Sequence, residues 1–168
     1  MMSAPQFSVE RRSADDLEPI QRLGERVFGP GRFARTAFRI RETIDPEESL
    51  CFVARVGSLL VGSNEMTPIR IGAAPAYILG PLVVESVFRS QGIGEALVKA
   101  SLEAAGAGGA SLTILVGDPP YYSRMGFAPT PRGKVQFPGP VDPARIMFFE
   151  HRAGAMSEAE GMVRGGGD

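Results

Sequence analysis

The sequence predicts one domain of the mixed α/β class, with a twisted, mostly antiparallel central sheet and helices on both of its faces. Two observations carry this prediction. Strand-like segments separated by tight turns come early in the chain, and a strand–helix–strand unit over residues 77–116 follows them. Hairpins join antiparallel strands, whereas a crossover through a helix joins parallel ones, so one sheet must contain both kinds of pair.

The composition sets limits on the class of protein. The chain has 168 residues, of which 43% are hydrophobic and 22% charged, so it can bury a full core without metals or disulfides. A net charge of −1 argues against a nucleic-acid-binding face. The single cysteine, Cys51, lies in an apolar run, which indicates a buried thiol and a reducing compartment.

The sequence also lacks the signals of export and membrane insertion. Residues 1–7 show no charged-then-apolar signal pattern. The longest largely apolar stretch, residues 73–84, is interrupted by Pro75, Gly80 and Pro81 and is too short to span a bilayer. We therefore expect a cytoplasmic protein with no membrane partner.

The first elements are a strand and two helices. Residues 7–11 indicate a short strand, and residues 15–28 indicate a helix capped by Ser13. A Gly-Pro-Gly break ends this helix, and residues 33–43 indicate a second one. The apolar face of the first helix is expected to consist of Leu17, Ile20, Leu23 and Val27.

The central elements are a hairpin and the crossover unit. Residues 50–56 and 59–70 indicate two strands joined by a tight turn. The crossover consists of a strand over residues 77–84, a helix over residues 93–105 and a strand over residues 112–116. The last of these is apolar at every position but one, which is typical of a strand covered on both faces.

The final elements are a short helix and one strand. Asp118 suits the N-cap of the helix, with Pro119 at its first position and Gly126 as its left-handed stop. Residues 145–150 indicate the last strand. The domain is expected to cover residues 1–151, and residues 152–168, rich in glycine and small residues, are expected to form a flexible tail.

A glycine-containing loop, residues 89–94, comes between the 77–84 strand and the helix that follows. The first N–H groups of that helix are unpaired and carry the positive end of the helix dipole, which favours a diphosphate. Arg89 can add a charge-assisted contact. A P-loop would need Gly-Lys-Ser/Thr, which is missing, and the dinucleotide fingerprint would need a small residue where Leu97 stands.

Gly80 and Pro81 interrupt the strand before this loop. Proline cannot donate to a sheet ladder, so the pair predicts a bulge that bends the strand away from its neighbour at residues 112–116. The backbone groups of Leu82, Val83 and Val84 would then face a gap, where an extended, amide-bearing arm such as pantetheine can pair with them. Taken alone, the pair is equally compatible with an incidental kink.

Two adjacent tyrosines, Tyr121 and Tyr122, lie in the short helix after Asp118. Neighbouring residues on a helix point about 100° apart, so we expect at most one of them to face a site.

Together these motifs resemble the GNAT superfamily of N-acetyltransferases, which shares Arg-x-x-Gly-x-Gly after a bulged strand and Tyr-x-x-x-Gly-Phe after the next one. Residues 79–84 and 117–127 are similar to the bacterial YhbS-like branch. The element order matches over residues 8–150, and the motifs match over residues 77–127. Asp118-Pro119 departs from the asparagine that many relatives carry there.

The resemblance implies a GNAT-like acyl-CoA N-acyltransferase fold with a splayed strand pair and acetyl-CoA as cosubstrate. It implies that the glycine loop binds the pyrophosphate, that the bulged strand pairs with pantetheine, and that Tyr122 protonates the leaving thiolate. The cofactor-binding residues that it implies are Leu82, Val83, Val84, Arg89, Ser90, Gln91, Gly92, Ile93, Gly94 and Glu95.

The expected reaction is direct transfer of an acetyl group to a primary amine. A tyrosine with a pKa of about 10 stays protonated where a thiol of about 8.5 does not, so Tyr122 can donate a proton. The alternative role for Tyr122 is packing. Glu65 and Glu85 are candidate general bases, although a solvated or ion-paired role is the commoner fate of such residues.

The alternative function is an acyl-CoA-binding sensor or regulatory module without transfer activity. One histidine, His151, and one cysteine cannot assemble a metal site. By the resemblance, Arg32 and Phe33 would lie beside the acceptor pocket, although surface solvation also explains Arg32. The acceptor amine is not identifiable, and a homodimer is compatible with the sequence.

Overall fold

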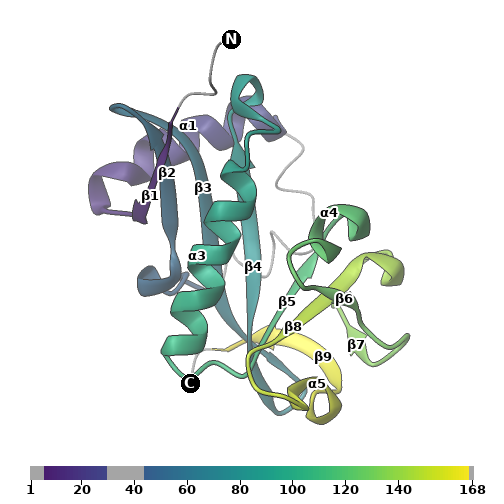
Figure 1. The fold of residues 1–168 in the computed structure, drawn as a ribbon. Coiled ribbons are helices and arrows are strands. Elements are labelled where there is room, and N and C mark those ends of the chain that lie inside the picture. The colour runs from purple at the N-terminus through teal and green to yellow at the C-terminus, as the bar shows by residue number, and fades with distance from the viewer. Residues whose placement is uncertain (1–5, 30–43, 167–168) are drawn as a thin grey trace.

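Nine strands pair into one mixed sheet in the part of the chain that the computed structural model describes, residues 6–29 and 44–166 (Figure 1). The main order is β1-β2-β3-β4-β5-β8-β6, and β9 adds to β3 and β7. The pairs β4–β5 and β7–β9 are parallel and the others antiparallel, so the sheet is mixed and mostly antiparallel, as expected, although β7 and β9 themselves were not predicted. The strands are β1 Ser8–Arg11, β2 Phe52–Val56, β3 Leu59–Ile71, β4 Ala74–Val84, β5 Leu112–Val116, β6 Ala128–Pro129, β7 Val135–Gln136, β8 Ile146–Glu150 and β9 Gly161–Gly165. The helices are α1 Leu17–Phe28, α3 Ile93–Ala107, α4 Pro119–Ser123 and α5 Ala155–Glu158, with 3-10 turns at Ala14–Asp16, Glu48–Leu50, Ser86–Phe88 and Pro143–Arg145.

Helices cover both faces of the sheet. α1 packs Leu23 against Val53 and Val83 on one face, and α3 packs Leu97 against Ala54 on the other (Figure 1). The expected apolar face of α1 is correct except at Leu17, which is 48% exposed. The expected helix over residues 33–43, with Arg32 and Phe33, lies outside the described residues.

Two contacts fix α3 on the sheet. Asn64 of β3 donates through Nδ2 to Ser101 Oγ at 2.9 Å, and Ser101 Oγ donates to the carbonyl oxygen of Leu50 at 2.8 Å. Gly62 lets the helix approach closely, because a Cβ atom there would lie only 2.9 Å from Leu97 Cδ1. The helix is therefore held by polar contacts within an otherwise apolar interface.

The bulge predicted in β4 is present. Asn64 pairs with Leu82 and Met66 with Leu79, so Gly80 and Pro81 together lie opposite the single residue between them on β3. The Gly80–Pro81 peptide bond is cis. This extra residue bends β4 within the sheet.

β4 and β5 separate beyond the first part of their pairing. Their only registered pairs are Tyr77 with Thr113 and Ile78 with Ile114. Beyond these residues the strands diverge toward α4 (Figure 1). The splayed strand pair predicted from the sequence is thus confirmed, and it leaves one edge of β4 without a neighbouring strand among the described residues.

The C-terminal segment corrects one expectation. Residues 152–166 do not form a loose tail but contain α5 and β9, and β9 pairs with β3 over residues 69–71. Met156 and Val163 are buried in a core cluster together with Ile69 and Ile71 of β3. The segment is ordered because it supplies backbone partners to the end of β3 that β2 does not reach, and because it buries apolar side chains there.

Candidate active site

A cleft of about 750 Å³ opens where β4 and β5 part. β4 and the start of α3 form one side, β5 and α4 form the other, and the C-terminal end of α1 contributes to the wall. This volume is typical of a small-molecule or cofactor site. The residues that line it are Val27, Phe28, Leu79, Gly80, Pro81, Leu82, Val84, Phe88, Arg89, Ser90, Gly92, Ile93, Gly94, Glu95, Leu115, Val116, Gly117, Asp118, Tyr121, Tyr122, Arg124 and Arg145.

The glycine loop forms one end of the cleft, here called the cradle end. Gly92 is the N-cap of α3 with φ +85°, and a Cβ atom there would meet nothing within 4 Å, so its backbone is open to a ligand. Ser90 also has a positive φ of 65°. The unpaired N–H groups of the first turn of α3 therefore face a loop of left-handed residues, which suits an anion.

Most of the predicted cofactor residues line the cleft, and two do not. Leu82, Val84, Arg89, Ser90, Gly92, Ile93, Gly94 and Glu95 are part of its wall. The side chain of Val83 points to the opposite face and packs in the α1 cluster, because side chains alternate along a strand. Gln91 also lies outside the wall, and its buried Oε1 atom has no hydrogen-bond partner in the described part of the structure.

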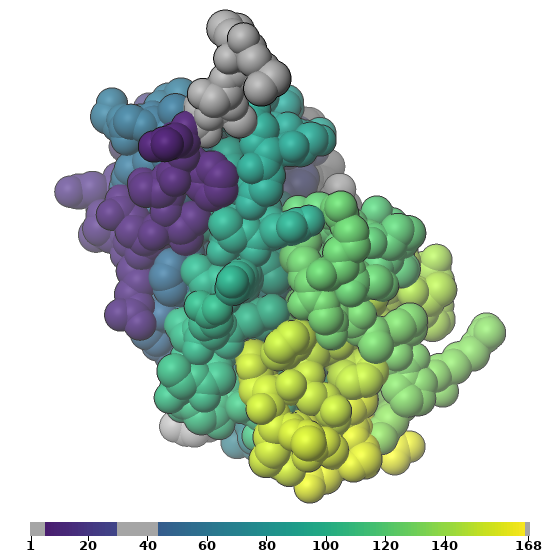
Figure 2. All heavy atoms as spheres, viewed as in Figure 1, coloured from purple at the N-terminus to yellow at the C-terminus, as the bar shows by residue number. Residues whose placement is uncertain are grey.

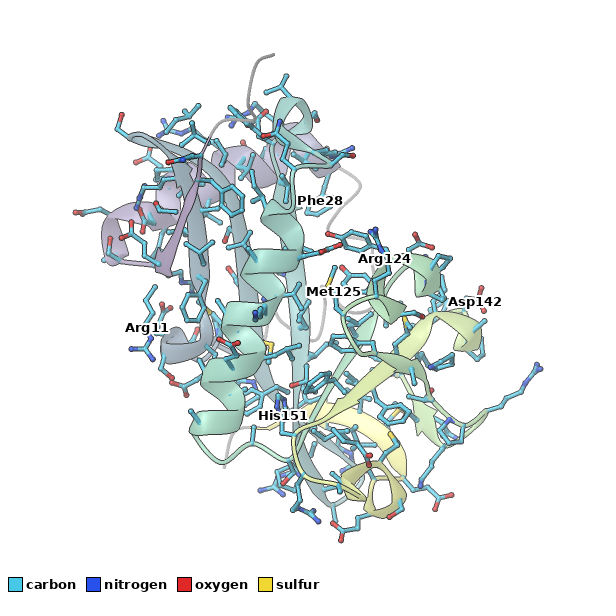
Figure 3. The ribbon with its side chains drawn as sticks, viewed as in Figure 1. Arg11, Phe28, Arg124, Met125, Asp142 and His151 are labelled. Atoms are coloured by element: carbon cyan, nitrogen blue, oxygen red, sulfur yellow. The ribbon has the colours of Figure 1, made fainter. Side chains whose placement is uncertain are left out.

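A bridge of three side chains connects α4 with α3 across the cradle end. Arg124 Nη2 lies 3.4 Å from Glu95 Oε1, and the Arg124 guanidinium lies 5.4 Å from the centre of the Tyr121 ring. Arg124 extends from the α4 side toward α3 in Figure 3, and the two regions meet on the surface in Figure 2. Burial raises the pKa of Tyr121, and the nearby Glu95 carboxylate raises it further. The Tyr121 hydroxyl contacts Gly94, where no side chain could fit without moving it.

The other end, here called the Gly117 end, is built around Gly117 at the end of β5. The ring of Tyr122 lies against Gly117, and a Cβ atom there would come within 2.8 Å of Tyr122 Cδ2. Tyr122 also makes edge contacts with Phe127 and Tyr121, at ring-centre distances of 6.0 and 5.0 Å. The expectation that only one tyrosine faces the site is wrong. The two rings do point in different directions, but the cleft extends around α4 and reaches both.

Arg145 is a cleft residue that the sequence analysis missed. Its Nε donates to the carbonyl oxygen of Gly117 at 3.0 Å, and its own carbonyl accepts from Gly117 N at 3.0 Å. These contacts extend the β5–β8 pairing by one residue beyond Val116 and Ile146. The predicted strand over residues 145–150 contained the signal, but its register against β5 was needed to find the contact.

The two candidate bases are ion-paired and lie outside the cleft wall. Glu65 accepts from Arg12 at 2.7 Å, and Glu85 accepts from Arg26 at 2.8 Å. Only Glu95 and Asp118 contribute carboxylates to the wall among the described residues. Of these, Glu95 faces Arg124, whereas Asp118 makes no side-chain cap bond at α4.

The remaining reactive side chains lie elsewhere. Cys51 is fully buried, and burial raises its pKa to about 11, which makes it a poor nucleophile. His151 contacts Thr113 Oγ1 at 2.8 Å and lies beside the C-terminal half of α3 (Figure 3). Within residues 6–29 and 44–166, no group of three His, Cys, Asp or Glu side chains is arranged to hold a metal ion. No helix of the same residues is both long and apolar enough to cross a bilayer.

Comparisons with known proteins agree with this geometry. The family model of the acetyltransferase (GNAT) domain matches residues 47–129, which include β4, α3, β5 and α4. No curated protein matches the sequence significantly. The structure is similar to that of the GNAT family N-acetyltransferase YhbS from Escherichia coli in complex with CoA, with a TM-score of 0.81 and 20% identity over 98% of this chain and 92% of that one.

Two further solved structures share the fold. A GNAT family acetyltransferase from Brucella melitensis, in complex with acetyl-CoA, has a TM-score of 0.67 and 23% identity over 87% of this chain and 88% of that one. Naa50 from Arabidopsis thaliana, in complex with the bisubstrate analogue CoA-Ac-MVNAL, has a TM-score of 0.58 and 17% identity over 84% and 95% of the two chains.

Proposed function

We propose that this chain, whose residues 47–129 match the family model of the acetyltransferase (GNAT) domain, transfers an acetyl group from acetyl-CoA to a primary amine. The observation that supports this most directly is the cleft. β4 and β5 stop pairing beyond Ile78 and Ile114, and the gap between them leads from the N-terminus of α3 to Tyr122. A narrow gap with an anion-binding turn at one end and a proton donor at the other suits a long thioester with a diphosphate.

The residues of the cleft fit acetyl-CoA in three respects. The first turn of α3, with the open backbone of Gly92 and the nearby Arg89, suits the pyrophosphate. The unpaired edge of β4 at Leu82, Val83 and Val84 suits the amides of pantetheine through main-chain groups, so the inward direction of the Val83 side chain does not matter. The volume of about 750 Å³ is sufficient for a ligand of this size.

Tyr122 is the proposed general acid. Transfer in a ternary complex forms a bond between the amine nitrogen and the acetyl carbon, and breaks the bond from that carbon to sulfur. Tyr122 donates its hydroxyl proton to the departing thiolate, the amine loses a proton to solvent, and the tyrosinate then takes a proton back from solvent. A protonated tyrosine is available at neutral pH, and positioned proton transfer contributes about 10²–10⁴-fold to rates. Since Glu65 and Glu85 are ion-paired outside the cleft, neither is retained as a base.

The test is the Tyr122→Phe variant, with Tyr121→Phe as its matched control. We expect Tyr122→Phe to bind acetyl-CoA normally by calorimetry but to release thiol about 10²–10⁴-fold more slowly with an accepted amine. Tyr121→Phe should slow turnover less. Unchanged turnover in Tyr122→Phe would remove the acid role. Acetyl-CoA binding without thiol release on any amine of a broad panel would instead support the sensor alternative.

Two narrower assignments are part of the same proposal. The assignment to the YhbS-like branch is supported by the sequences of residues 79–84 and 117–127. A cytoplasmic location is supported by the single cysteine, which needs no oxidising compartment.

A further inference from the structure

We propose that Arg145 determines acceptor specificity, and that the acceptor is an amine that also carries an anionic group, a carboxylate or a phosphate. This inference rests on the proposed transferase function and concerns the substrate class of the same cleft. It starts from the position of Arg145. The Arg145 side chain and the Tyr122 ring both contact Gly117, so Arg145 belongs to the Gly117 end, where, under the proposed function, the acceptor approaches the thioester.

Several hydrogen bonds fix the backbone of Arg145, and one more fixes its side chain. Asp142 caps the 3-10 turn Pro143–Arg145 by accepting from Ala144 N at 3.0 Å, and Arg145 N donates to the Asp142 carbonyl at 3.0 Å. The backbone of Arg145 pairs with Gly117, and its Nε donates to the same residue. An anchored guanidinium loses little conformational freedom when a ligand binds to it.

The anchoring leaves one side of the guanidinium for a ligand. Nε is occupied by the Gly117 carbonyl, whereas the two terminal nitrogens have no hydrogen-bond or ion-pair partner within the described residues. Two parallel N–H groups at the end of a guanidinium match the two oxygens of a carboxylate or phosphate. Arg145 lines the cleft, so this fork is accessible from it.

Asp118 adds a complementary charge next to Gly117. Its carboxylate lines the same end of the cleft, and it has no ion-pair partner in the described part of the chain. A cation and an anion that do not pair with each other, on one wall, fit an acceptor with both an ammonium and an anionic group. Asp118 then attracts the amine toward the thioester while Arg145 holds the other charge. The cradle end, in contrast, has its own cations in Arg89 and Arg124.

The experiment compares matched amine pairs that differ only in the anion. β-Alanine is tested against β-alaninamide for the carboxylate, and O-phosphoethanolamine against ethanolamine for the phosphate, by thiol release from acetyl-CoA. In the unmodified protein we expect kcat/KM to favour the anionic member of at least one pair by about 10- to 100-fold, the range for a charge-assisted bidentate contact. Which pair shows the preference identifies the anion.

Arg145→Gln should abolish this preference without changing the KM for acetyl-CoA, and Arg145→Lys should restore part of it. The backbone pair with Gly117 does not need the side chain, so both variants should fold, which thermal unfolding checks. Arg132→Gln is the control, because Arg132 is exposed and outside the cleft. Equal rates for both members of each pair in the unmodified protein, or a preference that survives in Arg145→Gln, would overturn the assignment of Arg145. Either outcome would leave the proposed transferase function standing. Acetyl-CoA binding with no thiol release on any amine would overturn the proposed transfer and this assignment together.

Discussion

Gly117→Ala tests whether the position of the Tyr122 ring controls catalysis. Gly117 does not have a positive φ, so alanine fits its backbone and the effect of the substitution is steric. The new Cβ atom would lie 2.8 Å from Tyr122 Cδ2, closer still to Cε2, and 3.0 Å from Leu115 Cδ1, whereas ordinary contacts begin near 3.4 Å. The ring must therefore retreat from the end of β5.

The size of the effect follows from this geometry. Clearing the contact moves the ring by about 1 Å, and a displacement of that size at a reacting group costs about 10²-fold in rate. Phe127 and Tyr121 stand against the other edges of the ring, so the retreat also strains their packing, at about 1–3 kcal/mol of unfolding free energy. The cradle end is untouched, and the KM for acetyl-CoA should stay within about twofold, since binding there does not involve Gly117.

The assay is kcat by thiol release in a cycle of four proteins: unmodified, Gly117→Ala, Tyr122→Phe and the double variant. If Gly117→Ala acts by displacing the Tyr122 hydroxyl, it should cost little more once that hydroxyl is gone. Gly24→Ala, in α1, is the control, because its Cβ meets nothing within 4 Å. Independent, multiplicative losses of rate in the double variant would refute the reasoning, as would a normal kcat in Gly117→Ala.

Three further predictions concern the bridge, the C-terminal segment and pH. Gly94→Ala should destabilise the protein by about 1–3 kcal/mol in urea, because its Cβ meets the Tyr121 hydroxyl. Adding Tyr121→Phe to Gly94→Ala should restore most of the lost stability, since without the hydroxyl the nearest ring atom, Cζ, is 3.6 Å from the new Cβ atom. If the two substitutions destabilised the protein additively, the contact would be contradicted. Met156→Ala should lower the free energy of unfolding by about 2–5 kcal/mol, because Met156 is buried in the core. Met162→Ala is the control, because Met162 is only half-buried. If Met156→Ala cost no more than this control, α5 would not be part of the core. Burial lowers the pKa of His151, so the unfolded state binds the extra proton first. Stability should be full above about pH 6.5 and fall as the pH decreases below it, and His151→Asn should lack this part of the pH profile, as unfolding titrations would detect.

The sequence was informative where structure depends on neighbouring residues. The turn at Gly57-Ser58, the bulge at Gly80 and Pro81, and the loop before α3 each follow from local backbone preferences, and each lies where predicted. The glycine loop at the cradle end and the edge of β4 beside it belong to one continuous segment, residues 82–95, so this part of the cleft wall was predictable, whereas Tyr121 and Arg124 join it from the α4 side.

The sequence was uninformative where the structure depends on pairing between distant segments of the chain. β9 has weak intrinsic preference for a strand, and it is ordered because β3 offers an unpaired edge about a hundred residues earlier in the chain. Arg145 reaches the Gly117 end of the cleft through a contact with a residue 28 positions away, which only the register of β8 on β5 reveals. The contact between the Tyr121 hydroxyl and Gly94 was also not predictable, because it depends on how α3 and α4 are placed relative to each other.

The buried polar contacts between β3, α3 and Leu50 have a consequence for the opposite end of that helix. The buried side of α3 is mostly apolar, and the burial of apolar surface is non-directional, so by itself it allows several rotations about the helix axis. Ser101 has hydrogen-bond partners in only one of them, because any other angle would leave Asn64 Nδ2 and the Leu50 carbonyl buried and unpaired. The hydrogen bonds of Ser101 thus fix the rotation of α3 about its axis. They thereby also fix the direction in which the first backbone N–H groups of the helix point, two turns away.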